Sequence, residues 1–201
     1  GIILLLNKMK KQDPIYIVLV RISLILFILF TGWLIWDHFI NRPSEIRHYL
    51  SANTDFKDKN YDSSLKKYLK AYEDNNEDVY IIEGIARSYM QLEDYKNSIN
   101  YFNLAIKLDP NFAPSYANLG VVYDRQKEYS NAIKFYEKAL SLDQELAVGM
   151  HWIDRLLYDV RETPSTISSR LDYLKLQMIL PENERLLSVE EIDQQQINYE
   201  K

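Results

Sequence analysis

The feature that most limits how this chain can fold is an internal repeat with a period of about 34 residues, the length of a helical hairpin unit. Residues 117–143, ANLGVVYDRQKEYSNAIKFYEKALSLD, contain a second copy of the pattern of residues 86–109, ARSYMQLEDYKNSINYFNLAIKLD. Three successive units carry matching aromatic and small residues: Tyr61, Tyr95 and Tyr129; Tyr68, Phe102 and Tyr136; Ala71, Ala105 and Ala139. A repeat of this kind predicts stacked copies of one supersecondary unit.

Each unit reads as two packed helices. Ala86 and Gly120 hold one repeated position in the first helix of a unit, and Ala105 and Ala139 hold one in the second. Small residues let two helices approach closely, while the tyrosines fill the wider gaps between hairpins. The chain has only 5 Gly and 6 Pro in 201 residues, which leaves little room for turn-rich β structure. The sequence therefore predicts an all-α fold.

These features resemble the tetratricopeptide repeat family, whose unit is a helix–turn–helix of the same length. The resemblance covers about residues 44–160, with units at about 45–78, 79–112 and 113–146 and then a fourth helix. It implies a helical-hairpin solenoid in which each hairpin covers the apolar face of its neighbour. The first helices of the units would line the concave surface.

The two ends of the repeat region depart from this pattern. In the first unit Asp55 stands where an apolar or aromatic residue is expected, so we predict a distorted or shifted opening helix in which Phe56 supplies the missing aromatic. After the fourth helix the sequence RETP interrupts the repeat. Residues 165–180 then place Ile167, Leu171, Leu174 and Met178 on one helical face, which predicts a capping helix over the open end of the stack.

The longest apolar run, residues 15–36, carries a single charge, Arg21. A helix of this length spans about 33 Å, close to the hydrocarbon core of a bilayer. Trp33 and Trp36 lie near one end and Tyr16 near the other, where interfacial aromatic residues belong. Arg21 lies about one and a half turns inside the boundary, so we interpret it as snorkelling, with contact to another membrane subunit as the alternative.

The segments beside this run suggest how it sits in a membrane. Residues 1–14 are basic, and lysines before a span favour a cytoplasmic amino end. Residues 37–43 form a short linker to the repeats, which would then lie on the opposite side. The run is too long for a signal peptide, and the residues after it offer no small-x-small cleavage site. The segment MKKQDP at Met9 reads as a natural start, and residues 1–8 receive no functional assignment.

We therefore predict a single-pass protein of the bacterial inner membrane, with the repeats in the periplasm. The alternative is a single-pass protein of the mitochondrial inner membrane. The net charge of -5 argues against nucleic acid as a partner. The chain has no cysteine, which excludes disulfides, thiolate metal sites and thiol nucleophiles. Residues 181–201 carry much of the negative charge and are predicted to form a loosely held acidic tail.

Residues that could carry chemistry are scattered. His38, His48 and His151 fit no ligand spacing, so no metal site is predicted. We find no glycine-rich phosphate loop and no nucleophile–histidine–acid set, and acidic pairs such as Glu93 and Asp94 read as solvated charge. The sequence therefore predicts no catalytic residue, no cofactor and no small-molecule substrate.

A protein-binding groove is the site that the resemblance implies. Helical phase places the following residues on the concave face: Tyr80, Glu83, Arg87, Met90, Asn118, Val121, Asp124, Arg125, His151, Arg155 and Tyr158. Mixed charge with aromatic side chains suits an extended peptide or a partner helix. The alternative for the arginines is solvated surface with weak local pairs to Glu83 and Asp124. Some family members bind a chaperone's terminal carboxylate through a basic clamp; Asn118 matches one clamp position, but Val148 and Trp152 stand where basic residues are needed.

The sequence thus favours a membrane-anchored scaffold or adaptor that binds other proteins, such as an accessory subunit of a membrane complex. Its lipid contacts would come from residues 15–36, with Arg21, Trp33 and Trp36 as the membrane-contacting residues. One alternative is an assembly factor in envelope or cytochrome biogenesis, and an enzyme is the alternative from a different class.

Overall fold

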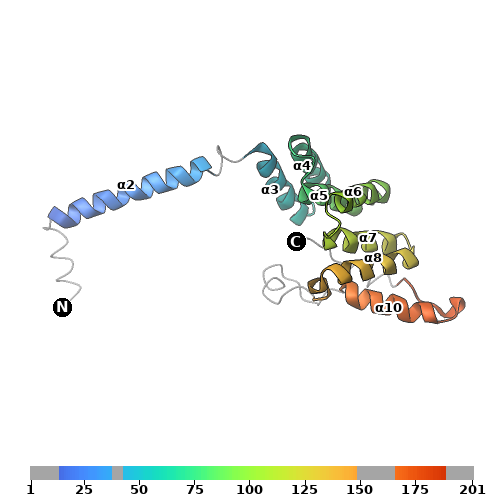
Figure 1. Cartoon of the computed structure of the whole chain (residues 1–201). Coiled ribbons are helices and arrows are strands. Elements are labelled where there is room, and N and C mark those ends of the chain that lie inside the picture. The colour runs from blue at the N-terminus through green and yellow to red at the C-terminus, as the bar shows by residue number, and fades with distance from the viewer. Residues whose placement is uncertain (1–13, 38–42, 149–165, 189–201) are drawn as a thin grey trace, which may run out of the picture. The chain divides into compact units, whose positions relative to one another are not determined.

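The structure is a computed structural model that describes residues 14–37, 43–148 and 166–188. The chain divides into two units, Gly1–Ser44 and Glu45–Lys201 (Figure 1). The described ranges are helical and contain no strand. This confirms the predicted all-α class, with one long amino-terminal helix and a repeat domain.

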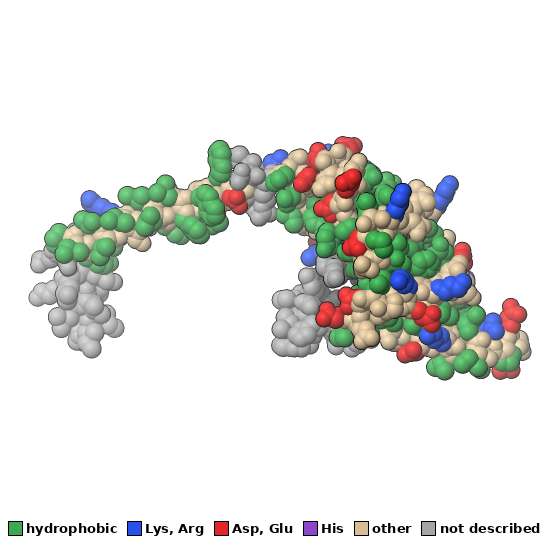
Figure 2. All heavy atoms as spheres, viewed as in Figure 1, with side chains coloured by type: hydrophobic (Ala, Val, Ile, Leu, Met, Phe, Trp, Pro, Cys, Tyr) green, Lys and Arg blue, Asp and Glu red, His purple; other side chains and the backbone are tan. Residues whose placement is uncertain are grey.

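The first unit contains α2, Pro14–Trp36, a continuous helix of 23 residues. Proline suits the first turn of a helix, where its missing N–H is not needed. None of the side chains of α2 is buried, and hydrophobic groups cover its visible face in Figure 2. The Thr31 hydroxyl donates to the carbonyl of Phe27 at 2.9 Å, so this polar group is satisfied within the helix. By length and composition α2 could cross a membrane.

The second unit is a series of helical hairpins followed by a single helix (Figure 1). The elements are α3 (Ser44–Lys57), α4 (Tyr61–Asp74), α5 (Val79–Gln91), α6 (Tyr95–Leu108), α7 (Ala113–Arg125), α8 (Tyr129–Leu142), the 3-10 turn η2 (Gln144–Ala147), α10 (Ile167–Ile179) and the 3-10 turn η3 (Glu182–Glu184). The hairpins α3–α4, α5–α6 and α7–α8 repeat one backbone plan.

The turn inside each hairpin is the most regular part of that plan. Lys59, Glu93 and Lys127 have φ of 61°, 61° and 63°, in the left-handed region, and they stand at equivalent positions of the three repeats. The next residue in each turn donates its N–H to the carbonyl five residues earlier, at 2.8, 3.0 and 2.8 Å. This is the usual way to close the carboxyl end of a helix, although glycine is the common residue there. The three turns therefore share one backbone conformation, although the residue type at this position differs between repeats.

The junctions after the hairpins repeat as well. The side chains of Asn75, Asp109 and Asp143 accept from the backbone N–H two residues later, at 3.3, 2.9 and 2.9 Å. Their own N–H groups donate to the carbonyls of Ala71, Ala105 and Ala139. A short polar side chain that bonds its own backbone stops a helix and starts a turn. Each hairpin thus ends in the same way, with or without a following proline.

Two glycines mark the closest helix contacts. A Cβ on Gly84 would lie 2.4 Å from the Tyr68 ring, and one on Gly120 would lie 2.4 Å from the Tyr136 ring. Tyr68, Phe102 and Tyr136, which share one repeat position, are fully buried. The rings of the second helices therefore press against first helices at positions that admit no side chain.

The opening helix α3 is continuous over 14 residues, so the predicted distortion is wrong. Asp55 pairs with Lys67 at 2.7 Å and accepts a hydrogen bond from Ser63. Phe56 does not replace the missing aromatic, because its ring packs edge-on against Tyr61 at 5.2 Å. An ion pair, rather than an aromatic side chain, fills this position in the first hairpin.

The carboxyl end of the repeats is covered by α10, which packs on α8. Ile167, Leu171 and Leu174 are buried there, as the capping-helix prediction requires. Thr166 caps the helix by accepting from the N–H of Ser169, whose hydroxyl accepts from the Thr166 N–H. The residues after α10 are not loose up to residue 188: the Leu186 N–H donates to Gln177 at 2.7 Å. Residues 189–201 lie outside the described part.

Candidate protein-binding groove

The predicted groove residues on α5 and α7 fall into three groups in the structure: exposed, joined by polar contacts, and buried in the core. Tyr80 begins the series and is 44% exposed. It follows Asp78, whose carboxylate accepts from the N–H of Tyr80 at 2.8 Å and caps α5. The Tyr80 ring meets Phe112 edge-on at 5.4 Å. This packing holds an aromatic side chain at the amino end of α5 while leaving much of it in solvent.

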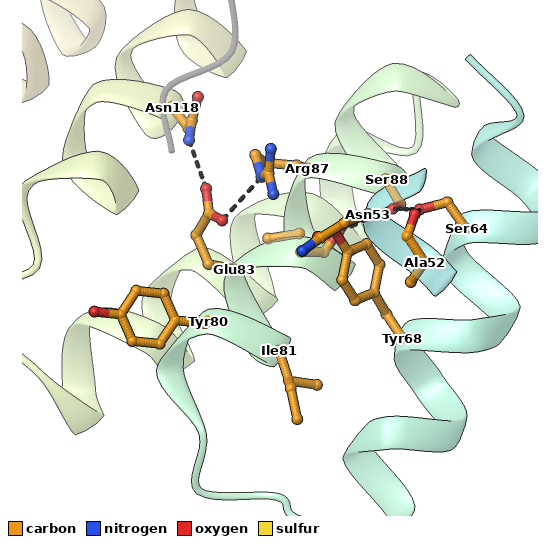
Figure 3. Close-up of polar contacts among 12 residues, drawn as sticks. Ala52, Asn53, Ser64, Tyr68, Tyr80, Ile81, Glu83, Arg87, Ser88 and Asn118 are labelled. Atoms are coloured by element: carbon orange, nitrogen blue, oxygen red, sulfur yellow. Dashed lines mark hydrogen bonds and ion pairs between the residues drawn. The ribbon is translucent and has the colours of Figure 1, made fainter. Parts of the chain in front are cut away.

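Glu83 is the centre of a buried polar cluster that joins two first helices (Figure 3). Its carboxylate pairs with Arg87 Nε at 2.8 Å and accepts from Asn118 Nδ2 at 2.9 Å. The Arg87 and Glu83 side chains are only 4% and 3% exposed. The Arg87 guanidinium also lies 4.7 Å from the Phe56 ring centre, which brings in α3. The cluster therefore links α3, α5 and α7.

Such burial changes the interpretation of these residues. The weak surface pair considered for Arg87 and Glu83 is instead a buried ion pair, and removing one partner of such a pair typically costs about 3–5 kcal/mol. The Asn118 amide donates one of its two N–H groups to Glu83, which ties this side chain to the buried cluster. These three residues hold the first helices together in addition to any contact with a partner.

Asp124 is the centre of a second cluster, and this one involves the capping helix. Arg170 donates from Nε to Oδ2 and from Nη2 to Oδ1, both at 2.7 Å. Tyr136 donates its hydroxyl to Oδ2 at 3.1 Å. The Arg170 and Asp124 side chains are each 2% exposed. Asp124, which was predicted to face a partner, instead fixes α10 to α7 by a two-point ion pair.

Sequence reasoning missed Arg170, although a signal for it exists. Arg170 lies on the same helical face as Ile167, Leu171 and Leu174. A charged residue on an apolar helix face calls for a buried partner of opposite charge. That rule predicts an acidic residue in the preceding hairpin without identifying which one.

Two predicted groove residues belong to the core. Met90 is 0% exposed and Val121 is 1% exposed, and both lie in the cluster that contains Phe102 and Tyr136. They were placed on the groove because they share a helix face with polar residues. In the structure that part of each first helix packs between hairpins. This correction removes Met90 and Val121 from the candidate binding surface.

Arg125, the last residue of α7, is half-buried and places a long, positively charged side chain beside the groove. Its Nη1 donates to the carbonyl of Met90 at 3.4 Å, which links the carboxyl end of α5 to α7. Tyr95 lies near this arginine, and burial raises the pKa of its phenol. Burial likewise raises the pKa of Tyr49, whose ring packs against Tyr68 at 5.9 Å. Both phenols therefore stay neutral at physiological pH.

The remaining predicted groove residues, His151, Arg155 and Tyr158, lie outside the described residues, as does Trp152. Within residues 14–37, 43–148 and 166–188, no group of three histidine, aspartate or glutamate side chains is placed to hold a metal ion. The described part of the site is therefore a surface of α5 and α7 with Tyr80 and Arg125 at its accessible positions.

Comparisons with known proteins agree with this architecture. A family model described as tetratricopeptide repeat matches residues 113–146, and one described as TPR repeat matches residues 86–127. No curated protein matched the sequence.

Two solved structures illustrate the structural likeness. The first TPR of Spaghetti (RPAP3), bound to the HSP90 peptide SRMEEVD, is 17% identical with a TM-score of 0.54; the match covers 68% of this chain and 94% of that one. The Arabidopsis OM64 TPR domain is 17% identical with a TM-score of 0.49; that match covers 51% of this chain and 84% of that one. At such identity the first of these supports the fold alone. Together with the internal repeat and the stacked hairpins, the two family matches show that the chain contains tetratricopeptide repeats.

Proposed function

We propose that this protein is a scaffold tethered to a membrane by α2, which uses its repeats to bind another protein as an accessory subunit of a membrane complex. The repeats support the protein-binding part of this role, because such solenoids present extended surfaces to partners. The membrane part rests on one observation, the exposed apolar helix Pro14–Trp36.

The chemistry of α2 supports an anchor. A helix of 23 residues is about 35 Å long, enough to cross a hydrocarbon core. Phe27, Phe30, Trp33 and Trp36 are each more than half exposed in a chain without lipid. The Trp33 and Trp36 rings, near the end of the helix, suit the membrane interface, and the Phe27 and Phe30 rings suit the hydrocarbon core. Basic residues before the helix favour an amino end in the cytoplasm and repeats on the other side.

The partner surface is proposed to be the concave side of α5 and α7. Tyr80 offers an exposed ring and Arg125 a long cation, while the Glu83 cluster and the Asp124 pair keep the helices beneath them rigid. Rigid support lowers the entropy cost of binding. An extended segment with apolar and acidic residues fits these two groups best.

Membrane attachment is tested by alkaline carbonate extraction of membranes that contain the full chain. We expect the protein to stay in the pellet, with an intact mass that includes α2. Release into the supernatant, or a mature mass that lacks residues 14–36, would show that α2 is not an anchor. Protease added to sealed vesicles of known sidedness then tests the orientation, since only the non-cytoplasmic face should expose the repeats.

Partner binding is tested by changing the accessible groove residues together. Tyr80→Ala with Arg125→Glu should abolish co-purification with the membrane complex while the protein stays folded. Lys134→Glu, a charge reversal on the exposed side of α8, is the matched control and should leave the partner bound. Arg87→Glu is unsuitable, because it would place a second carboxylate beside Glu83 in a buried site. Loss in the control alone would move the binding surface to the second helices.

A further inference from the structure

The amino end of the repeats presents an exposed face of α3. Ile46 and Leu50 are 40% and 42% exposed, and Thr54 and Lys57, one and two turns further along, are exposed as well. Their spacing places all four side chains on one face of the helix. The other face packs on the first hairpin, where Ala52 is fully buried. We call these four exposed residues the α3 stripe.

The α3 stripe carries positive charge and no carboxylate. Lys57 lies on it, and Arg47, which is also exposed, lies beside it. The two carboxylates of α3 lie elsewhere: Asp55 pairs with Lys67 of α4 at 2.7 Å, and Glu45 is half-buried. Apolar side chains flanked by cations are typical of a helix that lies on an anionic membrane surface.

The polar groups of the stripe can enter such a surface without losing their hydrogen bonds. The Thr54 hydroxyl donates to the carbonyl of Leu50 at 3.1 Å, so it needs no partner outside the helix. Lys57 and Arg47 have long apolar stems, which let their charges reach lipid headgroups while the stems cover apolar surface. Contact with lipid therefore leaves no polar group of the stripe unsatisfied.

A short connection keeps α3 close to α2. Residues 37–43 separate the end of α2 at Trp36 from the start of α3 at Ser44. A fully extended chain of this length reaches about 25–30 Å. A membrane that α2 spans is therefore always within reach of α3. Because the connection makes this contact intramolecular, a small apolar face is sufficient for it.

We propose that α3 lies on the surface of the membrane that α2 spans, with the α3 stripe against anionic lipid headgroups. This inference rests on the proposed function, because it takes α2 to be a membrane anchor. The stripe supplies a second attachment point beside the anchor. It restricts rotation of the repeats about the linker, and so presents the surface of α5 and α7 to partners in a restricted orientation.

Another exposed apolar group of the repeats does not share these properties. Leu176 and Ile179 of α10 are 64% and 80% exposed. However, α10 covers the carboxyl end of the repeats, away from the linker, and Glu182 and Glu184 follow it directly (Figure 1). An anionic membrane repels carboxylates. These two residues therefore serve as a control for apolar exposure alone.

A fluorescent dye tests the proposal in the full chain reconstituted into vesicles of phosphatidylcholine and phosphatidylglycerol. The chain has no native cysteine, so Thr54→Cys carries the dye on the α3 stripe and Asn103→Cys carries it on the exposed side of α6. Lipids with a nitroxide on the headgroup should quench the Thr54 dye by about half or more, because α3 lies at their level. They should leave the Asn103 dye almost unchanged. Equal quenching of both dyes, or of neither, would overturn the proposal.

Paired variants separate the stripe from apolar exposure in general. In the Thr54→Cys chain, Ile46→Ser with Leu50→Ser should reduce the quenching about threefold, because the contact loses its apolar area. Leu176→Ser with Ile179→Ser is the matched change at the other end and should leave the quenching as it was. Exposed positions of this kind have little effect on stability, which thermal midpoints check. Unchanged quenching in the α3 variant would contradict the assigned contact.

Lipid composition and flotation separate the remaining outcomes. Replacing phosphatidylglycerol by phosphatidylcholine, or adding salt, should weaken the quenching, since both remove charge attraction. Equal quenching in neutral vesicles would overturn the role of the cations. Quenching that appears only on dilution into excess lipid would assign the stripe to a second copy of the chain instead. A chain that floats with the vesicles but is not quenched overturns this inference alone, whereas a chain that does not float overturns the proposed anchor as well.

Discussion

The first hairpin and the two that follow it reach the same backbone with different side chains. In the second and third hairpins two aromatic rings stack between the helices: Tyr89 on Tyr101 with centres 5.7 Å apart, and Tyr123 on Phe135 at 5.2 Å. At the equivalent positions of the first hairpin stand Asp55 and Lys67, joined by an ion pair at 2.7 Å.

A hydroxyl contact varies in the same manner. Ser64 and Ser98 each donate to a carbonyl of the preceding helix, of Ala52 and Ala86, at 2.9 Å. The third hairpin has Ala132 at this position and makes no such bond there. Neither change alters the left-handed turn or the helix bounds. The left-handed turn and the close glycine contacts therefore determine the backbone of the hairpin. The stacked rings, the ion pair and the serine hydrogen bond between its helices can replace one another, and they determine its stability.

The two ends of the domain also differ. Ile46 and Leu50 of α3 are 40% and 42% exposed, whereas the third hairpin is covered by α10 through the Asp124–Arg170 pair. The carboxyl end should therefore depend on one buried ion pair, and the amino end should not. The following predictions test these contrasts in order of expected size.

The largest effect is expected from Arg170→Ala. It leaves the Asp124 carboxylate buried without its main partner, which should lower the free energy of unfolding by about 3–5 kcal/mol. Lys175→Ala on the same helix breaks an exposed pair with Glu137 and should cost at most about 1 kcal/mol. Urea unfolding of the full chain in detergent measures both. Similar losses in the two variants would contradict the assigned role of Asp124.

Next in size are the glycines that admit no side chain. Gly120→Leu should cost about 3 kcal/mol or more, because even the Cβ would overlap the Tyr136 ring. Gly84→Leu should cost a similar amount, because its Cβ would overlap the Tyr68 ring in the same way. Thermal midpoints measure the two changes. Gly84–Tyr68 is a contact between hairpins and Gly120–Tyr136 a contact within one, so no loss at either glycine would contradict the close approach of helices at that position.

A smaller effect is expected when the first hairpin is given the aromatic pair of the others. Asp55→Tyr with Lys67→Tyr should raise the free energy of unfolding by about 1 kcal/mol, since a stacked pair is worth more than a partly exposed ion pair. Denaturant midpoints at pH 7 measure the gain. A loss of more than about 1 kcal/mol would mean that the ion pair orients α3.

The same pair predicts a difference in pH dependence. Hydrogen bonds from Lys67 and Ser63 hold the pKa of Asp55 below its ordinary value of 3.8. The carboxylate therefore contributes stability above about pH 4, and this contribution is lost as the pH falls through its lower folded pKa. The Asp55→Tyr, Lys67→Tyr variant should lose less stability than the unmodified chain between pH 5 and pH 2. Parallel curves would show that the pair contributes nothing.

The smallest effect is expected in the left-handed turns. Glu93→Gly should raise the free energy of unfolding by about 0.5 kcal/mol, because glycine adopts a positive φ without the strain of a side chain. Lys59→Gly and Lys127→Gly should give similar gains, as their turns have the same geometry. Chemical denaturation of all three variants checks this, and unequal signs would show that the turns are not equivalent.

The repeat period was enough to predict the hairpins and the buried aromatic positions, and the helical spacing of Ile167, Leu171 and Leu174 predicted the capping helix. It did not predict that α3 is a continuous helix, because an Asp–Lys pair can replace a stack without any change in helical phase. It also did not predict the Asp124–Arg170 pair, which joins residues 46 positions apart, outside the period. Helical phase alone could not separate Met90 and Val121 from Tyr80, because one face of each first helix serves both the core and the groove.

Site-specific photo-crosslinking in native membranes tests the central claim most directly. A benzophenone amino acid at Tyr80 reports on the concave side, and one at Asn103 reports on the second helices. The account predicts an intermolecular adduct with a membrane-complex subunit from Tyr80 and none from Asn103. Adducts from Asn103 without any from Tyr80 would contradict the proposed groove.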